Sequence, residues 1–267
     1  MDVPEELVSY YTDGGELERL EQGIGLLEAS RTKELISRFL PERATVLDVG
    51  GGPGYYAEWL ASRGHTMHLI DPVPIHLEAA RRRAGDPARF TIGLGDARKL
   101  GQDDGEWDAV LLLGPLYHLP DRAERLAAWN EACRVCRPGG LILAAAISRF
   151  APALDGVRRG WLTDERSFET VRMQLEHGWR HDGVPTDFPS AYFHDPDELA
   201  EEAEEVGLLV EAVYGIEGPG WLLGDFEEKW ADPVMRERLL WLARTTEQDP
   251  RMRAVSNHLL LAANRPI

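Results

Sequence analysis

Positive charge, long apolar runs and cysteine are all scarce in this sequence of 267 residues. Lysine and arginine number 29 against 46 aspartates and glutamates, which gives a formal net charge of -17. A protein this acidic repels polyphosphate, so nucleic acid and anionic membranes are disfavoured as partners unless a basic patch intervenes. The one dense basic run, at residues 81–83, falls on a predicted helix beside acidic and apolar residues, and we interpret it as a solvated helix face.

No stretch approaches the roughly 18 consecutive apolar residues of a membrane-spanning helix. The first residues, MDVPEELVSYY, are acidic where a signal peptide needs a basic start and an apolar run. We therefore expect a soluble, cytoplasmic protein without a membrane partner, present as a monomer or homodimer that binds a small molecule.

The two cysteines, Cys133 and Cys136, have the C-x-x-C spacing of some redox and zinc sites. They fall near the end of a predicted helix, whereas a redox pair needs the helix N-terminus, where the dipole lowers the thiol pKa. The sequence contains no second C-x-x-C, and HGWRH at residues 177–181 lacks the glutamate of a zinc-binding helix. We interpret these side chains as packed thiols and surface histidines, and we expect no metal site.

Short apolar runs alternate with helical periods from residue 46 onward, which is the pattern of a parallel sheet covered by helices. The length favours one elaborated domain, and the short, regular connections predict a doubly wound, Rossmann-like α/β fold. Strands are predicted over 45–50, 66–71, 88–95, 107–114, 141–148, 208–216 and 258–264. Helices are predicted over 54–63, 74–83, 122–136 and 196–206.

Three segments fall outside this alternation and are predicted to form helical lid segments. Residues 1–40 are an acidic, helix-prone lead-in to the main domain, which we place at residues 41–267. Cap insertions occupy about 149–194 and 217–255, and five of the eight tryptophans lie beyond residue 150. Aromatic segments that emerge from strand ends are typical of a lid over an apolar ligand, although the core of a helical insertion has the same composition.

The most informative motif is VLDVGGGPGYYAEWLA, at residues 46–61. A buried strand runs directly into a glycine-rich loop and then into a helix, so the loop must turn sharply and let a ligand touch its backbone. The helix N-terminus favours a negatively charged group at this point. Dinucleotide folds prefer G-x-G-x-x-G, whose third glycine would fall at Tyr55, whereas the spacing here is D-x-G-x-G-x-G from Asp48.

Two further acids follow the next predicted strands. Asp71 ends the second strand, 21 residues after Gly50, where a carboxylate takes both hydroxyls of a ribose. Asp96, followed by the small Ala97, comes after the third strand, where it can accept from an exocyclic adenine amine. Each acid alone is also typical of turns and caps, but three at successive strand ends, counting Asp48, favour a cofactor that contains a nucleoside.

Together these motifs resemble the class I S-adenosylmethionine-dependent methyltransferases, in the small-molecule branch of types 11 and 25. The resemblance covers roughly residues 40–147 and returns at the final strands; it rests on VLDVGGGPG, LID, GDA, WDAVLLLG and CRPGGLILAAA in order. It implies a seven-stranded sheet with a reversed last strand, and S-adenosyl-L-methionine as cofactor. The glycine loop would hold the methionine part, whose carboxylate and ammonium take the place of a phosphate.

The resemblance also implies which residues contact the cofactor. Asp48 would support the loop or the amino group, Tyr10 and Tyr11 of the lead-in would close over the cofactor, and Arg31 would meet the methionine carboxylate. The predicted cofactor-binding residues are Asp48, Gly50, Gly51, Gly52, Gly54, Asp71, Pro72, Asp96, Ala97, Leu113, Tyr11 and Arg31.

Methyl transfer from a sulfonium is an in-line displacement, so much of its catalysis is positioning and exclusion of water. A base is needed only when the acceptor carries a proton that leaves early, and a histidine suits a hydroxyl. The end of the fourth strand adjoins the methyl group in this family, and LYHL resembles the histidine-containing turn of many small-molecule members. We therefore predict Tyr117 and His118 as catalytic residues; the alternative is that His118 caps the helix starting near Pro120.

The predicted reaction is O- or N-methylation of a small molecule. GPLY does not match the Asn/Asp-Pro-Pro-aromatic motif of many amine-methylating relatives, which disfavours that subclass. Arg149 suits a carboxylate or phosphate on the substrate, although a surface arginine fits the sequence as well. The predicted substrate residues are Arg149, Trp161, Tyr192 and Trp221.

Two other functions remain open at this point. An NAD(P)-dependent oxidoreductase is disfavoured by the glycine spacing and by the reversed last strand. A non-catalytic module that keeps the cofactor fold would retain the same glycines, Asp71 and Asp96.

Overall fold

The computed structural model describes residue 11, residues 17–179 and residues 191–267. Tyr10 and His181, both considered above, lie outside the described residues. Of the predicted lid over residues 1–40, residues 1–10 and 12–16 also lie outside them.

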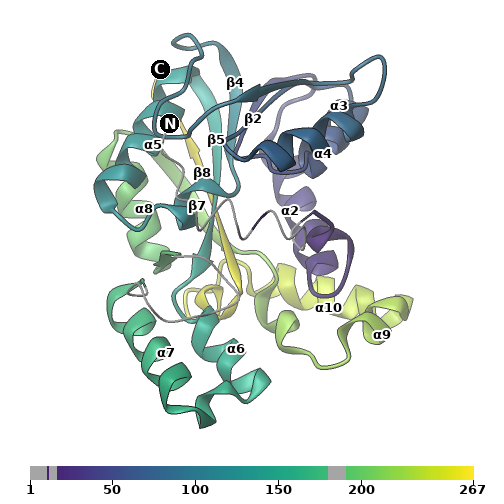
Figure 1. Ribbon diagram of the computed structural model, residues 1–267, viewed down its shortest axis with the longest axis vertical. Helices are drawn as coiled ribbons and strands as arrows, with labels where there is room; N and C mark the ends of the chain where they lie inside the picture. Colours follow the sequence, from purple (N-terminus) through teal and green to yellow (C-terminus); the bar gives the residue numbers. More distant parts are fainter. Residues whose placement is uncertain (1–10, 12–16, 180–190) are drawn as a thin grey trace.

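Within the described residues, eight strands form one mixed sheet (Figure 1). Seven of them follow the order β3-β2-β1-β4-β5-β8-β7, and β8 runs antiparallel to both β5 and β7. The chain builds outward from β1 to β3 and then returns to β4, which is the doubly wound topology predicted. The strands are β1 (Thr45–Val49), β2 (Thr66–Asp71), β3 (Thr91–Leu94), β4 (Trp107–Leu112), β5 (Cys136–Ser148), β7 (Leu209–Gly215) and β8 (His258–Asn264).

The reversed last strand is confirmed, and an eighth strand is added to the seven expected. This extra strand, β6 (Phe193–His194), pairs in parallel with the last two residues of β5. A strand of two residues is too short to show the pattern of apolar and polar residues from which strands are predicted. The fifth strand also begins earlier than predicted, because Cys136 pairs with Trp107 before a shift in register.

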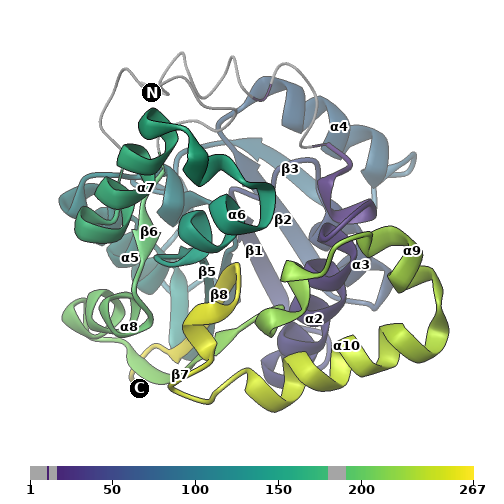
Figure 2. The same cartoon turned by 90° about the horizontal axis from the view of Figure 1, so that it is seen from below.

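The central strands are apolar because both faces of the sheet are covered by helices. On one face lie α2 (Gly25–Phe39), α3 (Tyr55–Ser62) and α4 (Pro74–Ala84), whose apolar residues join one core with β1, β2 and β4. On the other face lie α5 (Arg122–Val135) and α8 (Pro196–Glu205), which bury Trp129 and Leu199 in a second core. Figures 1 and 2 show these two helical layers on either side of the strands.

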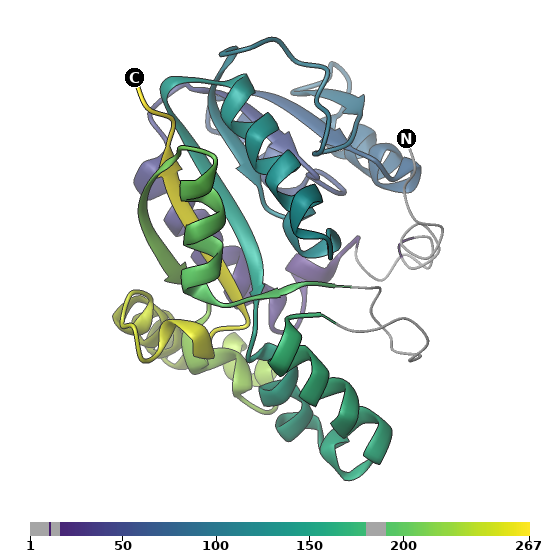
Figure 3. The same ribbon diagram turned by 90° about the vertical axis from the view of Figure 1, so that its left-hand side faces the viewer.

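Two insertions extend this sandwich. After β5 the chain forms α6 (Ala151–Arg159) and α7 (Glu165–His177), a helical pair that projects beyond the end of the sheet (Figure 3). Between β7 and β8 it forms α9 (Phe226–Ala231) and α10 (Pro233–Thr246), and α10 packs against α2. No helix in the described ranges has the length and apolar character needed to cross a membrane.

The fourth strand opens into a 3-10 turn, η2 (Pro115–His118), before α5 begins. The side chain of Asp121 accepts a hydrogen bond from the Ala123 N–H and so caps α5. The alternative reading of His118 as the helix cap is therefore wrong, and its ring is left for another role.

Candidate active site

A cavity of about 750 Å³ lies at the carboxyl ends of β1 to β4, beneath residues of the lead-in. Parallel strands of a doubly wound sheet place their following loops at this edge, which is the usual ligand crevice of such folds. Ten of the twelve predicted cofactor residues line it, together with both predicted catalytic residues. These twelve are Tyr11, Asp48, Gly50, Gly51, Gly52, Asp71, Pro72, Asp96, Ala97, Leu113, Tyr117 and His118.

The glycine loop is shaped by positive φ angles and by close packing. Gly50 and Gly52 have φ values of 69° and 55°, in the left-handed region that favours glycine. A Cβ on Gly51 would come within 2.7 Å of the Asp48 carboxylate. Gly54 also has a positive φ but faces Ala80 and Phe90, so it shapes the start of α3 without lining the cavity.

Asp71 ties the glycine loop to the end of β2. One of its carboxylate oxygens accepts from the Gly52 N–H at 2.9 Å. The other accepts from the Val73 N–H at 2.8 Å and lies 3.1 Å from Nδ1 of His76. His76 is buried, lines the same cavity and was not predicted, because a histidine inside a helix gives no signal of its own.

The carboxylate of Asp48 lies at this end of the cavity without a hydrogen-bond partner among the described residues. The side chain is buried. Burial, reinforced by the nearby Asp71 carboxylate, raises the pKa of Asp48 to about 7. A buried carboxylate without a donor is a site for a cationic or hydrogen-bond-donating ligand group.

Asp96 has a protein partner in this structure. Arg98 contacts both oxygens of the Asp96 carboxylate, at 2.6 and 3.0 Å, and also pairs with Glu124. Burial opposes ionisation, but the Arg98 guanidinium outweighs it and holds the pKa of Asp96 below its usual value. Asp96 is therefore an ionised acceptor whose position at the cavity wall is fixed by Arg98.

Four ring side chains meet beside the η2 turn. The hydroxyl of Tyr11 lies 2.6 Å from Nε2 of His118, and the Tyr11 ring meets the His76 ring edge-on at 4.5 Å. Tyr117 lies beside His118 with ring centres 4.6 Å apart. Burial, with His76 close by, lowers the pKa of His118 to about 3, so its imidazole is neutral throughout the neutral pH range.

Arg31 does not reach the cavity, contrary to the prediction. Its fully buried guanidinium pairs with Glu34 and Glu247 and donates to the Ile216 carbonyl. These partners hold the connection after β7 and the end of α10 against α2. The sequence pattern could not anticipate this, because Glu247 lies 216 residues away along the chain.

The four predicted substrate residues also lie away from the described cavity wall. Arg149 and Tyr192 share Glu198 as a partner, and the Trp221 indole is buried and donates to the Val255 carbonyl at 2.8 Å. Trp161 is 45% exposed on the connection between α6 and α7. Arg149, Tyr192 and Trp221 instead hold the insertions in place, and no described residue of 149–194 or 217–255 lines the cavity.

The far side of the cavity is formed by residues that the sequence did not single out. Ala145 of β5, Ile216 after β7 and His258 at the start of β8 line it, together with Glu28 of α2. One signal was available: because the last strand is reversed, its first residue lies at the same edge as the carboxyl ends of the others.

Comparison with known proteins finds relatives described as methyltransferases. A family profile described as a methyltransferase domain matches residues 46–140. A ubiquinone biosynthesis O-methyltransferase from Methylocella silvestris is 35% identical over 199 residues, or 68% of this chain and 66% of the relative. One from Thiobacillus denitrificans is 30% identical over 177 residues, or 64% of this chain and 67% of the relative. The match therefore spans just under two thirds of the Methylocella relative.

Solved structures share the fold at low sequence identity. A structure of S-adenosylmethionine-dependent methyltransferases from Methanosarcina mazei superposes with a TM-score of 0.60 at 19% identity, covering 87% of this chain and 97% of that one. At this identity the likeness concerns the fold, and it agrees with the sheet order and the reversed β8 described above.

Proposed function

Because this chain belongs to the class I S-adenosylmethionine-dependent methyltransferases, in the branch of types 11 and 25, we propose that it methylates a hydroxyl oxygen of a small organic acceptor. S-adenosyl-L-methionine, the cofactor of this family, supplies an electrophilic methyl group on a sulfonium when it is bound. The nicotinamide-dependent and non-catalytic alternatives gain no support from the relatives described above.

The observation that carries the proposal is the Asp48 carboxylate. It is buried beside the glycine loop without a donor among the described residues, so it fits the ammonium group of the methionine part. The loop backbone is open above Gly52, where even a Cβ would meet no described atom within 4 Å. At this end the cofactor would need a negatively charged partner for its ammonium group and close access to the loop backbone. Asp48 and the open loop at Gly52 fit these two needs.

Two further acids support the nucleoside part. Asp71, held by the Gly52 and Val73 N–H groups, would accept from the ribose hydroxyls. Asp96, fixed by Arg98, would accept from the adenine amine, and the small Ala97 leaves room beside it. Leu113 and Pro72 would give apolar contact on either side.

The acceptor site lies between the η2 turn and the start of β8. Tyr117, His118, Ala145 and Ile216 line this part, which suits an acceptor with an apolar body. Transfer to oxygen is favoured by the two relatives named as O-methyltransferases. Tyr117 and His118 would hold the acceptor in line with the methyl group and keep water out.

The lead-in is proposed as the lid of this site. Tyr11, Arg19 and Glu28 line the cavity from that segment, and the ring of Tyr11 reaches across to His118. The insertions over 149–194 and 217–255 are proposed as caps that support the edge of the acceptor site. A monomer or homodimer acting in the cytoplasm, without nucleic acid, completes the proposal.

The test is a pair of binding and turnover measurements on the full chain. Calorimetry should detect S-adenosylhomocysteine and not NAD, and release of S-adenosylhomocysteine should be followed with catechol, phenol, benzyl alcohol and aniline as acceptors. We expect turnover with a hydroxyl acceptor and little with aniline. Binding of NAD in place of S-adenosylhomocysteine, or turnover with aniline alone, would overturn the proposal.

A further inference from the structure

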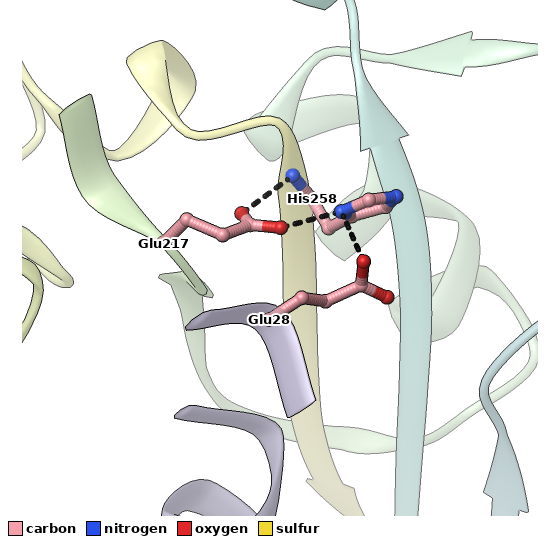
Figure 4. A group of neighbouring side chains, drawn as sticks. All are labelled: Glu28, Glu217 and His258. Carbon is pink, nitrogen blue, oxygen red and sulfur yellow. Dashed lines mark hydrogen bonds and ion pairs between the residues drawn. The ribbon is translucent and has the colours of Figure 1, made fainter. Parts of the chain in front are cut away.

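Three buried side chains from distant parts of the chain meet at the acceptor side of the cavity (Figure 4). Nδ1 of His258, the first residue of β8, lies 2.6 Å from the Glu217 carboxylate and 3.5 Å from the Glu28 carboxylate. Their ligand-type atoms all lie within 4.8 Å of one another. His258 and Glu28 line the cavity, and Glu217 is fully buried behind them.

Glu217 is held in one orientation by the chain around it. One oxygen accepts from the Ser256 hydroxyl at 2.6 Å and from the His258 backbone N–H at 3.0 Å. Its other oxygen faces Nδ1 of His258. The Glu217 backbone N–H donates back to the Ser256 hydroxyl at 2.8 Å, so the carboxylate and the ring are locked to the ends of β7 and β8.

This geometry sets the tautomer of His258. With Nδ1 facing two carboxylates, the proton of a neutral ring resides on Nδ1, and Nε2 carries the lone pair. Figure 4 shows Nε2 on the opposite side of the ring from Glu217 and Glu28. A cavity-lining histidine whose Nδ1–H is held by a buried carboxylate, with Nε2 on the other side of the ring, has the arrangement of a general base.

We propose that His258 is the catalytic base that receives the proton of the acceptor hydroxyl, and that Glu217 is its positioning residue. This inference rests on the proposed O-methyl transfer. The acceptor oxygen forms the new O–C bond with its own electron pair, and the electrons of the C–S bond go to sulfur. The hydroxyl proton passes to Nε2 of His258, which later releases it to solvent.

The charges around His258 support this role. The charged groups that face it are the carboxylates of Glu217 and Glu28 and, beyond Glu28, the guanidinium of Arg19, which pairs with both oxygens of Glu28. Burial alone would lower the pKa of His258, but Glu28 and Glu217 outweigh burial and Arg19 and raise it. The pKa of His118 is shifted the opposite way, so of these two cavity histidines His258 is the stronger proton acceptor.

The same charges favour a proton over a divalent cation at this point. With His258 neutral, the carboxylates of Glu28 and Glu217 and the Arg19 guanidinium leave one excess negative charge, which is balanced when His258 takes up the acceptor proton. Replacing that proton by a divalent ion would leave one excess positive charge in a buried site. If turnover instead depended on a divalent ion, His258 would be a metal ligand and not a base, and chelation tests this alternative.

The decisive variants are His258→Asn and Glu217→Gln, with His177→Asn as the control. An asparagine amide nitrogen replaces Nδ1 and keeps the hydrogen bond to Glu217, but it has nothing in the place of Nε2. His177 is exposed at the end of α7, away from the cavity wall. The full chain is assayed with S-adenosyl-L-methionine and catechol between pH 6 and 9, and S-adenosylhomocysteine affinity is measured in parallel.

We expect His258→Asn to lower kcat by about 100-fold, the lower end of the usual general-base contribution, with cofactor affinity within about twofold of wild type. Glu217→Gln should move the acidic limb of the kcat profile to lower pH, because a neutral amide no longer stabilises the imidazolium. His177→Asn should behave as wild type. His258→Gln provides a second variant if His258→Asn melts below the assay temperature.

Three outcomes would overturn the inference. In the first, wild type turns over catechol and both His258 variants do so equally well. In the second, kcat falls but its pH profile is unmoved in Glu217→Gln, which would indicate a purely structural pair. In the third, chelation abolishes turnover and Mg²⁺ or Zn²⁺ restores it. If wild type methylates none of the acceptors, the proposed function itself fails, and that result is distinct from the other three.

Discussion

The hydroxyl of Tyr11 lies 2.6 Å from Nε2 of His118, although 107 residues separate the two along the chain. This contact joins the lead-in to the turn after β4. It also places the Tyr11 ring against His76, which in turn contacts Asp71. The proposed lid is therefore connected to both the acceptor side and the ribose side of the cavity.

Replacement of Tyr11 by phenylalanine removes this hydrogen bond and keeps the ring. A neutral hydrogen bond contributes about 1 kcal/mol, so we expect S-adenosylhomocysteine to dissociate about fivefold faster, because the lead-in opens more readily. Stopped-flow displacement measures this rate. The matched control is Tyr214→Phe, whose ring is buried in the α2 side of the core. An unchanged dissociation rate in Tyr11→Phe would separate Tyr11 from lid closure.

Replacement of His118 by alanine tests the catalytic role predicted from the sequence. A ring whose pKa is about 3 is a weak base at neutral pH, so we expect it to act by holding the acceptor. The kcat of His118→Ala should fall about tenfold, cofactor affinity should change much less, and the acidic limb of the pH profile should stay in place. Steady-state kinetics across pH check this. Turnover equal to wild type would remove His118 from the mechanism.

The side of the cavity formed by the glycine loop, Asp71 and Asp96 was predictable because its signals are local. The glycine loop, Asp71 and Asp96 each follow a strand directly, and each strand is recognisable from its own apolar run. The helical layers followed from the same alternation, whereas the reversed β8 was implied by the resemblance to the methyltransferase family. These features depend on residues close together in the chain, so the order of motifs was enough to place them.

The opposite side of the cavity, where we propose that the acceptor binds, depends on contacts between distant segments and was not predictable. Glu28, Glu217 and His258 come from three separate elements, and each resembles an ordinary surface residue in the sequence. Arg31 and Trp221 failed for the same reason: their partners, Glu247 and Val255, lie in the long connection between β7 and β8. The sequence therefore did not reveal whether a charged or aromatic side chain in the lead-in or in an insertion faces a ligand or packs within the protein.

Replacement of Arg31 by leucine tests the corrected position of that residue. Breaking a buried ion pair typically costs about 3 to 5 kcal/mol, so the free energy of unfolding should fall by about 3 kcal/mol in denaturant titrations. Arg244→Leu is the matched control, because Arg244 also pairs with Glu34 but is largely exposed, and its loss should cost less than about 1 kcal/mol. Folded Arg31→Leu should bind S-adenosylhomocysteine as wild type does; a clear loss of affinity would restore the predicted carboxylate contact.

Replacement of Asp48 by asparagine should stabilise the protein without ligand and weaken cofactor binding. The pKa of Asp48 is raised from an ordinary 3.8 to about 7, so between these values the folded chain holds a proton that the unfolded chain has lost. This contribution to stability is fully present below about pH 3.8 and is lost as the pH rises through 7. At pH 8 Asp48→Asn should therefore exceed wild type by on the order of 3 kcal/mol in unfolding free energy.

Binding should show the opposite order, because the ligand ammonium interacts with the ionised carboxylate. Wild-type affinity for S-adenosylhomocysteine should rise as the pH passes from 6 to 8, whereas Asp48→Asn should bind about 100-fold more weakly at pH 8 and lack this rise. Calorimetry at each pH, paired with denaturant titrations, measures both effects on the same samples. Equal affinity in the two proteins would mean that the ammonium lies elsewhere, and a stability difference that does not change with pH would contradict the raised pKa. The two effects together would show that this buried carboxylate destabilises the unliganded fold and is retained because it binds the cofactor.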